Sequence, residues 1–196
     1  LYLPGNYGAD ALADILAGDV NPSGKLPYTY PKYEQGLLTY DHKPSQNISG
    51  KMEGAYDYGA QTSVQYPFGF GLSYTTFEYS NLSVDKKEFI SGDSLTVSVD
   101  VKNTGSVIGK EAVMLFSSDL VASLTPDVRR LRSFEKIELN PGESKTVKLS
   151  ISADDLAFVN ELGKWTLEEG DFRLQVGNQV DVVKCTATKV WTTPNK

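Results

Sequence analysis

The stretch Leu95-Thr96-Val97-Ser98-Val99-Asp100-Val101 decides the fold of this chain. Apolar and polar residues alternate along it, which is typical of a β-strand that buries one face and leaves the other in water. Residues 147–151 repeat the alternation. The continuous apolar run 112–116 predicts a central strand that is covered on both faces. Residues 77–192 are therefore expected to be consecutive β-strands.

The elements between these strands are predicted from turn chemistry. Asn140-Pro141-Gly142-Glu143 has the composition of a tight turn. The apolar residues change from even to odd positions between Phe134 and Ile137, and a β-bulge there would explain this change. Residues 156–159 lie between strands and are expected to form a single helical turn.

The C-terminal part is expected to hold a hairpin and a last strand. Residues 164–167 and 172–176 would pair across the turn 168–171, and the last strand would run over about 183–190. Seven or so strands at turn spacings of about 8–12 residues indicate an immunoglobulin-like antiparallel β-sandwich. The fold class is thus mainly β.

One short amphipathic helix is expected near the N-terminus, over Tyr7–Ala17. Asn6 is the expected N-cap and Gly18 the expected stop. The apolar side chains fall on one face, and a helix this short is marginal alone in water. Residues 1–31 are therefore expected to be loosely held without a larger body to pack on.

Residues 32–76 have no sustained period and are rich in Tyr, Gly and Ser. A structureless stretch of this length is unusual inside a compact domain. We expect a connector that lies over another domain. Its tyrosines are interpreted as staples that bury aromatic area, with stacking on sugar rings as the alternative. They are Tyr40, Tyr56, Tyr58, Tyr66 and Tyr74.

Composition argues against a nucleic-acid partner, a membrane span and an internal disulfide. The chain has 196 residues, a net charge of −6 and a pI of about 4.9, which argues against a nucleic-acid partner. It has no apolar run of about 18 residues, so no membrane span is expected. Its single cysteine, Cys185, excludes an internal disulfide and is expected to be a small buried side chain. The sequence begins at Leu1, and we expect a piece of a longer polypeptide.

Several polar residues are candidates for a binding or metal site. His42 is the only histidine, and one imidazole is no metal cluster; it is interpreted as part of a connector, with a sugar contact as the alternative. The acidic clusters at 154–155 and 168–171 lack calcium-loop spacing and are interpreted as turn caps. Arg129, Arg130 and Arg132 are expected on a loop and a strand edge. No catalytic, cofactor or metal residue is assigned.

Two further features were considered. Asn47-Ile48-Ser49 and Asn81-Leu82-Ser83 are glycosylation sequons, which matter only in a eukaryotic secretory host. Trp165 lies in an alternating stretch and is expected in the core.

Three segments, in order, resemble glycoside hydrolase family 3. The segment Gly18-Asp19-Val20-Asn21-Pro22-Ser23-Gly24-Lys25-Leu26-Pro27 resembles the end of that family's second domain. Tyr66-Pro67-Phe68-Gly69-Phe70-Gly71-Leu72-Ser73-Tyr74-Thr75-Thr76-Phe77 resembles the start of its C-terminal domain. Val101–Gly105, Gly109–Glu111 and Leu139–Glu143, together with 170–177, resemble its fibronectin type III-like domain.

The resemblance implies residues 1–31 as the end of the α/β domain, 32–76 as the connector and 77–192 as the fibronectin type III-like sandwich. The implied parent is a retaining β-glucosidase that acts on terminal β-linked sugars, needs no cofactor, and is periplasmic or secreted. Its partners would be a β-linked oligosaccharide and the upstream catalytic domains. The family's nucleophile lies in a Ser-Asp-Trp-like motif, which Ser118-Asp119-Leu120 does not match. The chain alone is expected to be inactive.

Two alternatives stay open. The sandwich could be a binding module for a polysaccharide or a cell surface rather than a structural domain. The parent could also act on xylose or N-acetylglucosamine, because the residues that contact the sugar are expected upstream.

Overall fold

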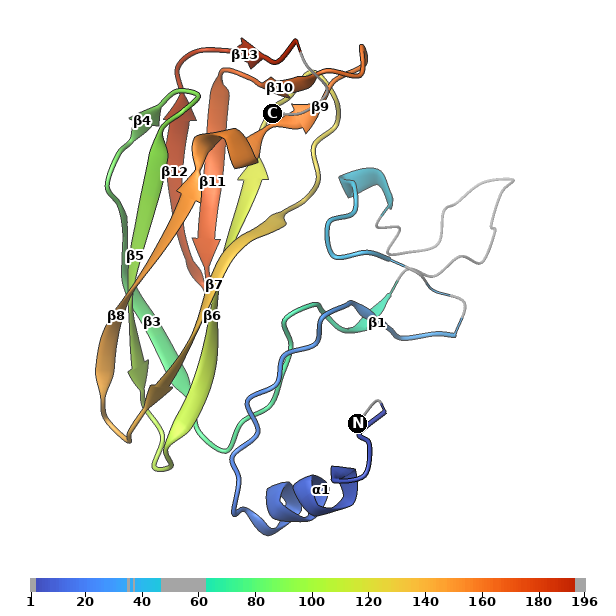
Figure 1. Ribbon diagram of the computed structural model, residues 1–196, viewed down its shortest axis with the longest axis vertical. Coiled ribbons are helices and arrows are strands. Elements are labelled where there is room, and N and C mark those ends of the chain that lie inside the picture. Colours follow the sequence, from blue (N-terminus) through green and yellow to red (C-terminus); the bar gives the residue numbers. More distant parts are fainter. Residues whose placement is uncertain (1–2, 35, 37, 47–62, 193–196) are drawn as a thin grey trace.

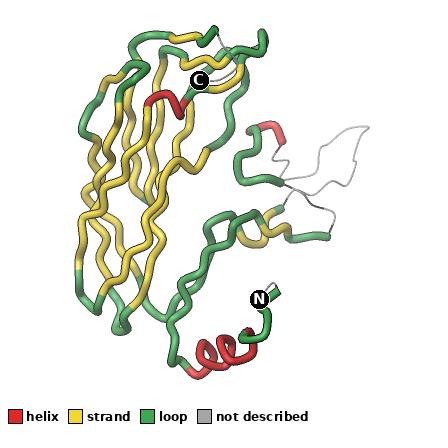
Figure 2. Tube along the Cα trace, viewed as in Figure 1, coloured by secondary structure: helices red, strands yellow, loops and turns green. Residues whose placement is uncertain are grey.

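The computed structural model describes residues 3–34, 36, 38–46 and 63–192. Two β-sheets pack face to face into a sandwich, and an N-terminal helix and a connector lie beside it (Figure 1, Figure 2). The first sheet has the strand order β3-β5-β8 and the second has β4-β12-β11-β6-β7. All pairings are antiparallel except that of β12 with β4. The predicted antiparallel sandwich is confirmed.

The strands of the two sheets have the following bounds. The three-stranded sheet consists of β3 (Phe77–Val84), β5 (Ser94–Asn103) and β8 (Ser144–Ser152). The five-stranded sheet consists of β4 (Glu88–Phe89), β12 (Gln179–Cys185), β11 (Gly170–Val176), β6 (Gly109–Asp119) and β7 (Arg130–Leu139).

The sandwich core is built from the alternating strands. The apolar residues of 95–101 and 147–151 point inward on β5 and β8, and all are at most 4% exposed. From the facing sheet come the side chains of Val113, Leu115, Leu174 and Val176, all fully buried. Burial of such aliphatic side chains is the main source of stability in a domain of this size. The periodicity of the sequence therefore identified the core correctly.

Short helices and strands precede the sandwich or lie at one of its ends. The helix α1 (Gly8–Ala17) is followed by Gly18, and β1 (Tyr30–Pro31), just before the connector, pairs with β2 (Val64–Tyr66) of the connector. Three short strands form an end sheet of order β13-β10-β9. They are β9 (Phe158–Val159), β10 (Trp165–Leu167) and β13 (Lys189–Val190), and the 3-10 helices are η1 (Pro44–Gln46) and η2 (Ala153–Leu156).

The helix begins one residue later than expected and without the expected cap. Tyr7 occupies the N-cap position and no side chain caps it, so the assignment to Asn6 is wrong. Gly18 has a left-handed φ of 87°, and its N–H and that of Asp19 satisfy the last carbonyls, as expected of a glycine stop. Gly8 is the only buried residue of this helix. None of the described helices is long and apolar enough to cross a bilayer.

The bulge in β7 lies earlier than predicted. Pairing is regular from Phe134 to Ile137, whereas Ser133 pairs with Leu115 and Leu131 with Phe116, so Arg132 is the extra residue. The parity shift has another cause: Phe134 points outward and is 66% exposed. An exposed aromatic side chain looks the same as a buried one in a sequence pattern.

Three further expectations about elements are wrong. The helical turn is η2, which overlaps the expected 156–159 only at Leu156. The 164–167 segment does not form a hairpin with β11: β10 pairs with β9 and β13. β11 pairs instead with β12 and β6. The last strand is split into β12 and β13. For the strands, the local sequence is compatible with β-structure, and distant chain segments decide the pairing partner.

Candidate functional site

The chain leaves the helix and returns from the connector along the same path. Residues 21–27 and 67–75 run side by side (Figure 1). The Leu26 N–H donates to the Phe70 carbonyl at 2.8 Å, and the Gly69 N–H donates to the Leu26 carbonyl at 2.8 Å. A Cβ at Gly71 would collide with the Gly24 carbonyl, so the close approach requires glycine there. Two of the segments that resemble the family thus form one unit.

Asn21 links this unit to the sandwich. Its Nδ2 donates to the Ile108 carbonyl at 2.9 Å. Its Oδ1 accepts hydrogen bonds from the Tyr74 N–H at 2.8 Å and from the Ser73 hydroxyl at 3.0 Å. One amide therefore joins three segments that are far apart in sequence.

Asn103 forms a second link and is fully buried. Its Oδ1 accepts from the Thr75 hydroxyl at 2.5 Å and from the Gly105 N–H at 3.1 Å. Its Nδ2 donates to the carbonyls of Val107 and Leu139 at 2.8 and 3.0 Å. Because a buried amide is costly unless it is hydrogen-bonded, this arrangement fixes the geometry of the strand end.

An ion pair completes the contact. Lys25 Nζ lies 2.9 Å from Glu111 Oε2 on β6, and the two side chains are only 18% and 11% exposed. The Tyr79 hydroxyl of β3 donates to Glu111 Oε1 at 3.0 Å. Burial, and then the charge and the hydrogen bond of Glu111, raise the pKa of Tyr79 above its ordinary value. We call Asn21, Lys25, Thr75, Asn103 and Glu111 the junction.

The connector is held to the sandwich by aromatic contacts. The rings of Tyr40 and Phe68 stack with centroids 4.3 Å apart, and Phe68 meets Phe116 of β6 edge-on at 6.1 Å. The Arg129 guanidinium lies over the Phe116 ring, 4.6 Å from its centroid. These contacts cover the outer face of β6, where the run 112–116 predicted burial on both faces.

The remaining tyrosines of the connector divide into two groups. Tyr66 stacks on Phe70 with centroids 4.8 Å apart, and the Tyr74 hydroxyl donates to the Ile15 carbonyl at 2.6 Å. Both contacts are within the chain, as the staple interpretation requires. Tyr56, Tyr58 and the sequon at Asn47 lie outside the described residues.

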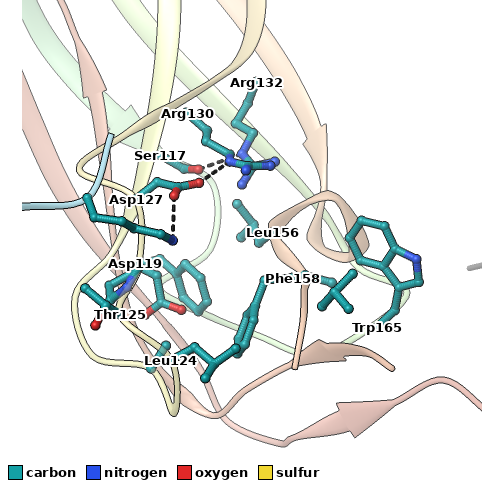
Figure 3. Close-up of a pocket in the computed structure, with 16 residues that line it drawn as sticks. Ser117, Asp119, Leu124, Thr125, Asp127, Arg130, Arg132, Leu156, Phe158 and Trp165 are labelled. Carbon is teal, nitrogen blue, oxygen red and sulfur yellow. Dashed lines mark hydrogen bonds and ion pairs between the residues drawn. The ribbon is translucent and has the colours of Figure 1, made fainter. Parts of the chain in front are cut away.

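A cleft of about 340 Å³ opens at the end of the sandwich that carries the end sheet. We call it the end cleft. Figure 3 shows Asp119 and Thr125 on one side of it and Phe158 and Trp165 on the other. Leu124 and Leu156 contribute further apolar surface. Its lining comes from the connector, β6, the loop 120–129, β7, η2 and the end sheet.

Cationic and acidic side chains alternate on the polar wall of the end cleft. Lys43 Nζ lies 2.7 Å from Asp127 Oδ1, and Arg130 Nε pairs with Asp127 Oδ2 (Figure 3). Burial would raise the pKa of Asp127, but hydrogen bonds from these two cations outweigh it and lower the pKa. Asp127 is therefore ionised and already paired on both oxygens.

Two groups on the same wall have a different environment. Arg132 Nε donates to the Ser117 hydroxyl at 2.7 Å, and its Nη1 donates to the Asp155 carbonyl. Burial raises the pKa of Asp119 to about 6, opposed by the Val121 N–H and reinforced by the charge of Glu168. Because neutral pH lies above this value, Asp119 is mainly ionised there and accepts hydrogen bonds.

The other candidate residues make structural contacts or are buried. His42 Nδ1 lies 2.7 Å from the Thr39 carbonyl. Among residues 3–34, 36, 38–46 and 63–192, no group of three or more His, Cys, Asp and Glu side chains is placed to hold a metal ion. Cys185 is fully buried, which confirms the prediction. Asn81 of the second sequon is exposed and donates to Asp100.

Two of the acidic side chains act as turn caps, as predicted. Asp154 accepts from the Gly92 N–H at 3.0 Å and from the Ser91 hydroxyl at 2.8 Å. Glu168 accepts from the Ser123 N–H at 2.8 Å and from its hydroxyl at 2.5 Å.

Trp165 is not in the core. It is partly buried at the core margin and lines the end cleft, whereas Leu167 of the same strand, β10, is fully buried in the core. The junction and the end cleft were not predicted as sites. The only sequence signal for the junction was the set of polar residues inside the quoted motifs. The end cleft has no recognisable signal in the sequence.

Comparison with protein families decides the affiliation of the chain. Residues 1–74 match the glycosyl hydrolase family 3 C-terminal domain, and residues 111–180 match the fibronectin type III-like domain. The chain belongs to glycoside hydrolase family 3. It represents the C-terminal region of these enzymes, and the Lys25–Glu111 ion pair of the junction joins the two matched segments.

Curated relatives are similar over most of the chain. The lysosomal beta glucosidase of Dictyostelium discoideum is 41% identical over 91% of this chain and 22% of its own length. A beta-xylosidase of Formosa agariphila is 40% identical over 88% and 24%. The periplasmic beta-glucosidase of Salmonella typhimurium is 36% identical over 90% and 24%. The chain thus spans about a quarter of the length of these relatives.

Solved structures agree with the fold. A beta-glucosidase from Listeria innocua in complex with glucose is 32% identical and has a TM-score of 0.82 over 94% of this chain and 27% of its own. The D270A mutant beta-glucosidase from Listeria innocua, in complex with laminaribiose, is 32% identical. It has a TM-score of 0.80 over 94% of this chain and 27% of its own.

Proposed function

We propose that this chain is the C-terminal portion of a retaining, exo-acting β-glucosidase that removes terminal β-linked glucose from oligosaccharides. The similarity to the lysosomal and periplasmic beta-glucosidases over about 90% of the chain supports this function. The catalytic carboxylates would lie in upstream domains. The chain contributes no catalytic residue and is inactive alone.

The role of the sandwich in this proposal is structural. The observation that carries it is the junction, where Asn21 and the Lys25–Glu111 ion pair bind the glycoside hydrolase segment to the fibronectin type III-like domain. The divisions 1–31, 32–76 and 77–192 are proposed as the hydrolase end, the connector and the sandwich. The partners are the upstream catalytic domains and a β-linked oligosaccharide, with no nucleic acid and no membrane.

The experiment compares this chain with the full-length protein on an aryl β-glucoside. The full-length protein should release the aryl group, and the chain alone should release none above a mock purification. Turnover that rises in proportion to the chain, after removal of contaminating enzyme, would contradict the proposal. Circular dichroism on the same sample shows that the chain is folded.

A β-xylosidase is the second candidate, because the Formosa agariphila relative is 40% identical to this chain. The ratio of kcat/KM for aryl β-glucoside and aryl β-xyloside on the full-length protein separates the two candidates. A ratio in favour of the xyloside would replace the first proposal by the second.

A periplasmic or secreted location is proposed from the same relatives, one of which is named periplasmic. Fractionation of the source cells and activity measurement in each fraction would test it.

A further inference from the structure

We propose that the end cleft is a binding site for a β-linked gluco-oligosaccharide. The substrate class rests on the proposed function, whereas the site itself rests on the lining of the end cleft. No residue of the junction lines it. The sandwich would then have a binding role in addition to its structural one.

The size and composition of the end cleft suit a sugar. Its volume of about 340 Å³ falls at the lower end of the range of about 300–1,000 Å³ for ligand pockets. Phe158 and Trp165 form an apolar wall, and Asp119 and Arg132 lie on the polar side (Figure 3). A pyranose needs such a pair of walls, because its C–H face packs on aromatic rings and its hydroxyls need hydrogen-bonding groups.

The polar wall is held in place before any ligand arrives. The Ser117 hydroxyl and the Asp155 carbonyl fix the Arg132 guanidinium, whose remaining N–H groups form a planar donor set. Such a planar fork can donate to two adjacent oxygens at once. Asp119 accepts a hydrogen bond from the Val121 N–H at 3.2 Å, and its half-buried carboxylate can accept further hydrogen bonds from sugar hydroxyls. A rigid site loses less entropy on binding.

The charges favour a neutral ligand over an anion. Lys43 and Arg130 are both engaged by Asp127, which leaves Arg132 as the further cation of the wall. The carboxyls of Asp127 and Asp155 act on its charge, and the carboxyl of Asp119 lies on the same wall. A phosphate or carboxylate ligand would meet these acids, whereas a polyol can hydrogen-bond to acids and guanidinium alike.

The test uses this chain and two named probes, laminaritetraose and cellotetraose. Isothermal titration calorimetry should give a Kd of about 1 mM, typical of a single weak site. Trp165→Ala and Asp119→Asn should each weaken binding about fivefold or more, and Trp165→Phe should retain part of it.

Matched controls lie on the outer faces of β7 and β11. Phe134 and Arg173 are exposed and outside the end cleft, so Phe134→Ala and Arg173→Gln should leave the Kd unchanged. Thermal unfolding of each variant separates loss of binding from loss of fold.

Several outcomes would overturn the proposal. One is the absence of binding heat at 10 mM probe, a concentration of about ten times the expected Kd. Another is an equal loss in the Phe134→Ala control. A third is that Trp165→Ala lowers the melting temperature of the full-length protein without changing probe binding, which would mark the end cleft as an internal domain contact. Hydrolysis by the full-length protein is measured separately, so failure here leaves the proposed function standing.

Discussion

The sandwich and the N-terminal helix differ sharply in how their apolar side chains are used. Within the sandwich, Leu95, Leu115 and Leu174 are fully buried. On α1, Leu16 is 73% exposed and the amphipathic face has no described partner of comparable size. A leucine side chain therefore contributes much more to the stability of the fold in the sandwich than on α1. Sequence hydrophobicity identifies a face, and only the surroundings make it a core.

The largest expected effect is the loss of a core side chain. Leu115→Ala should lower the free energy of unfolding by about 2–5 kcal/mol, because it removes buried methyl groups and leaves a cavity. Leu16→Ala, the matched change on α1, should alter it by no more than about 0.5 kcal/mol. Urea denaturation followed by circular dichroism measures both. Equal effects would contradict the contrast between the two regions.

A smaller effect is expected at the junction, which joins the two regions. Glu111→Gln should cost about 1–3 kcal/mol, because it weakens charge-assisted hydrogen bonds with Lys25 and Tyr79. Glu138→Gln is the matched control: it breaks the Lys110–Glu138 pair, whose side chains are 55% and 53% exposed, and should cost almost nothing. A double-mutant cycle of Glu111→Gln with Lys25→Met isolates the pair, and zero coupling would show that the two side chains act independently.

A still smaller effect is expected from pH at the end cleft. The folded-state pKa of Asp119 is about 6, above the ordinary value of 3.8, so the folded state binds more protons between these values. Stability from this group is therefore complete below pH 3.8 and lost as the pH rises through 6. Asp119→Asn should stabilise the chain by about 1 kcal/mol at pH 7.5, after allowance for solvent screening of a half-exposed group.

The measurement is the free energy of unfolding of wild type and Asp119→Asn from pH 5 to pH 8. The difference between them should widen toward high pH. A constant difference over this range would contradict the raised pKa.

The smallest thermodynamic effect is expected for the N-terminal region itself. Protease should cut within residues 3–20 first, because an exposed helix opens more readily than a packed strand. The trimmed chain should melt within about 2 °C of the intact one, since little buried area is lost. Mass spectrometry of early digests identifies the cuts. Equal resistance along the whole chain would show that the helix has a partner after all.

The sequence predicted well those strands in which apolar and polar residues alternate. Alternation over 95–101 and 147–151 corresponds to β5 and β8, and the turn at 140–143 closes with a hydrogen bond from the Glu143 N–H to the Asn140 carbonyl. A period of two depends only on neighbouring residues, so it is legible without tertiary information.

The parts that were missed depend on distant partners. Residues 165–167 form the strand β10, but its partner β13 lies about 24 residues further along the chain. The bulge at Arg132 likewise depends on how β7 pairs with β6. The end cleft could not be predicted for the same reason, since Asp119, Arg132 and Trp165 come from three separate elements. The family resemblance located the junction residues within motifs, but their contacts required coordinates.

The paired exit and return segments have a consequence for chain length. Because residues 21–27 and 67–75 are fastened to each other and to the sandwich, the chain leaves residue 27 and returns to residue 67 at one place. Closing a loop costs an entropy that grows only logarithmically, about 0.6 kcal/mol for each doubling of length. Insertions and deletions between the two ends should therefore be tolerated without moving the sandwich relative to the segment that precedes it.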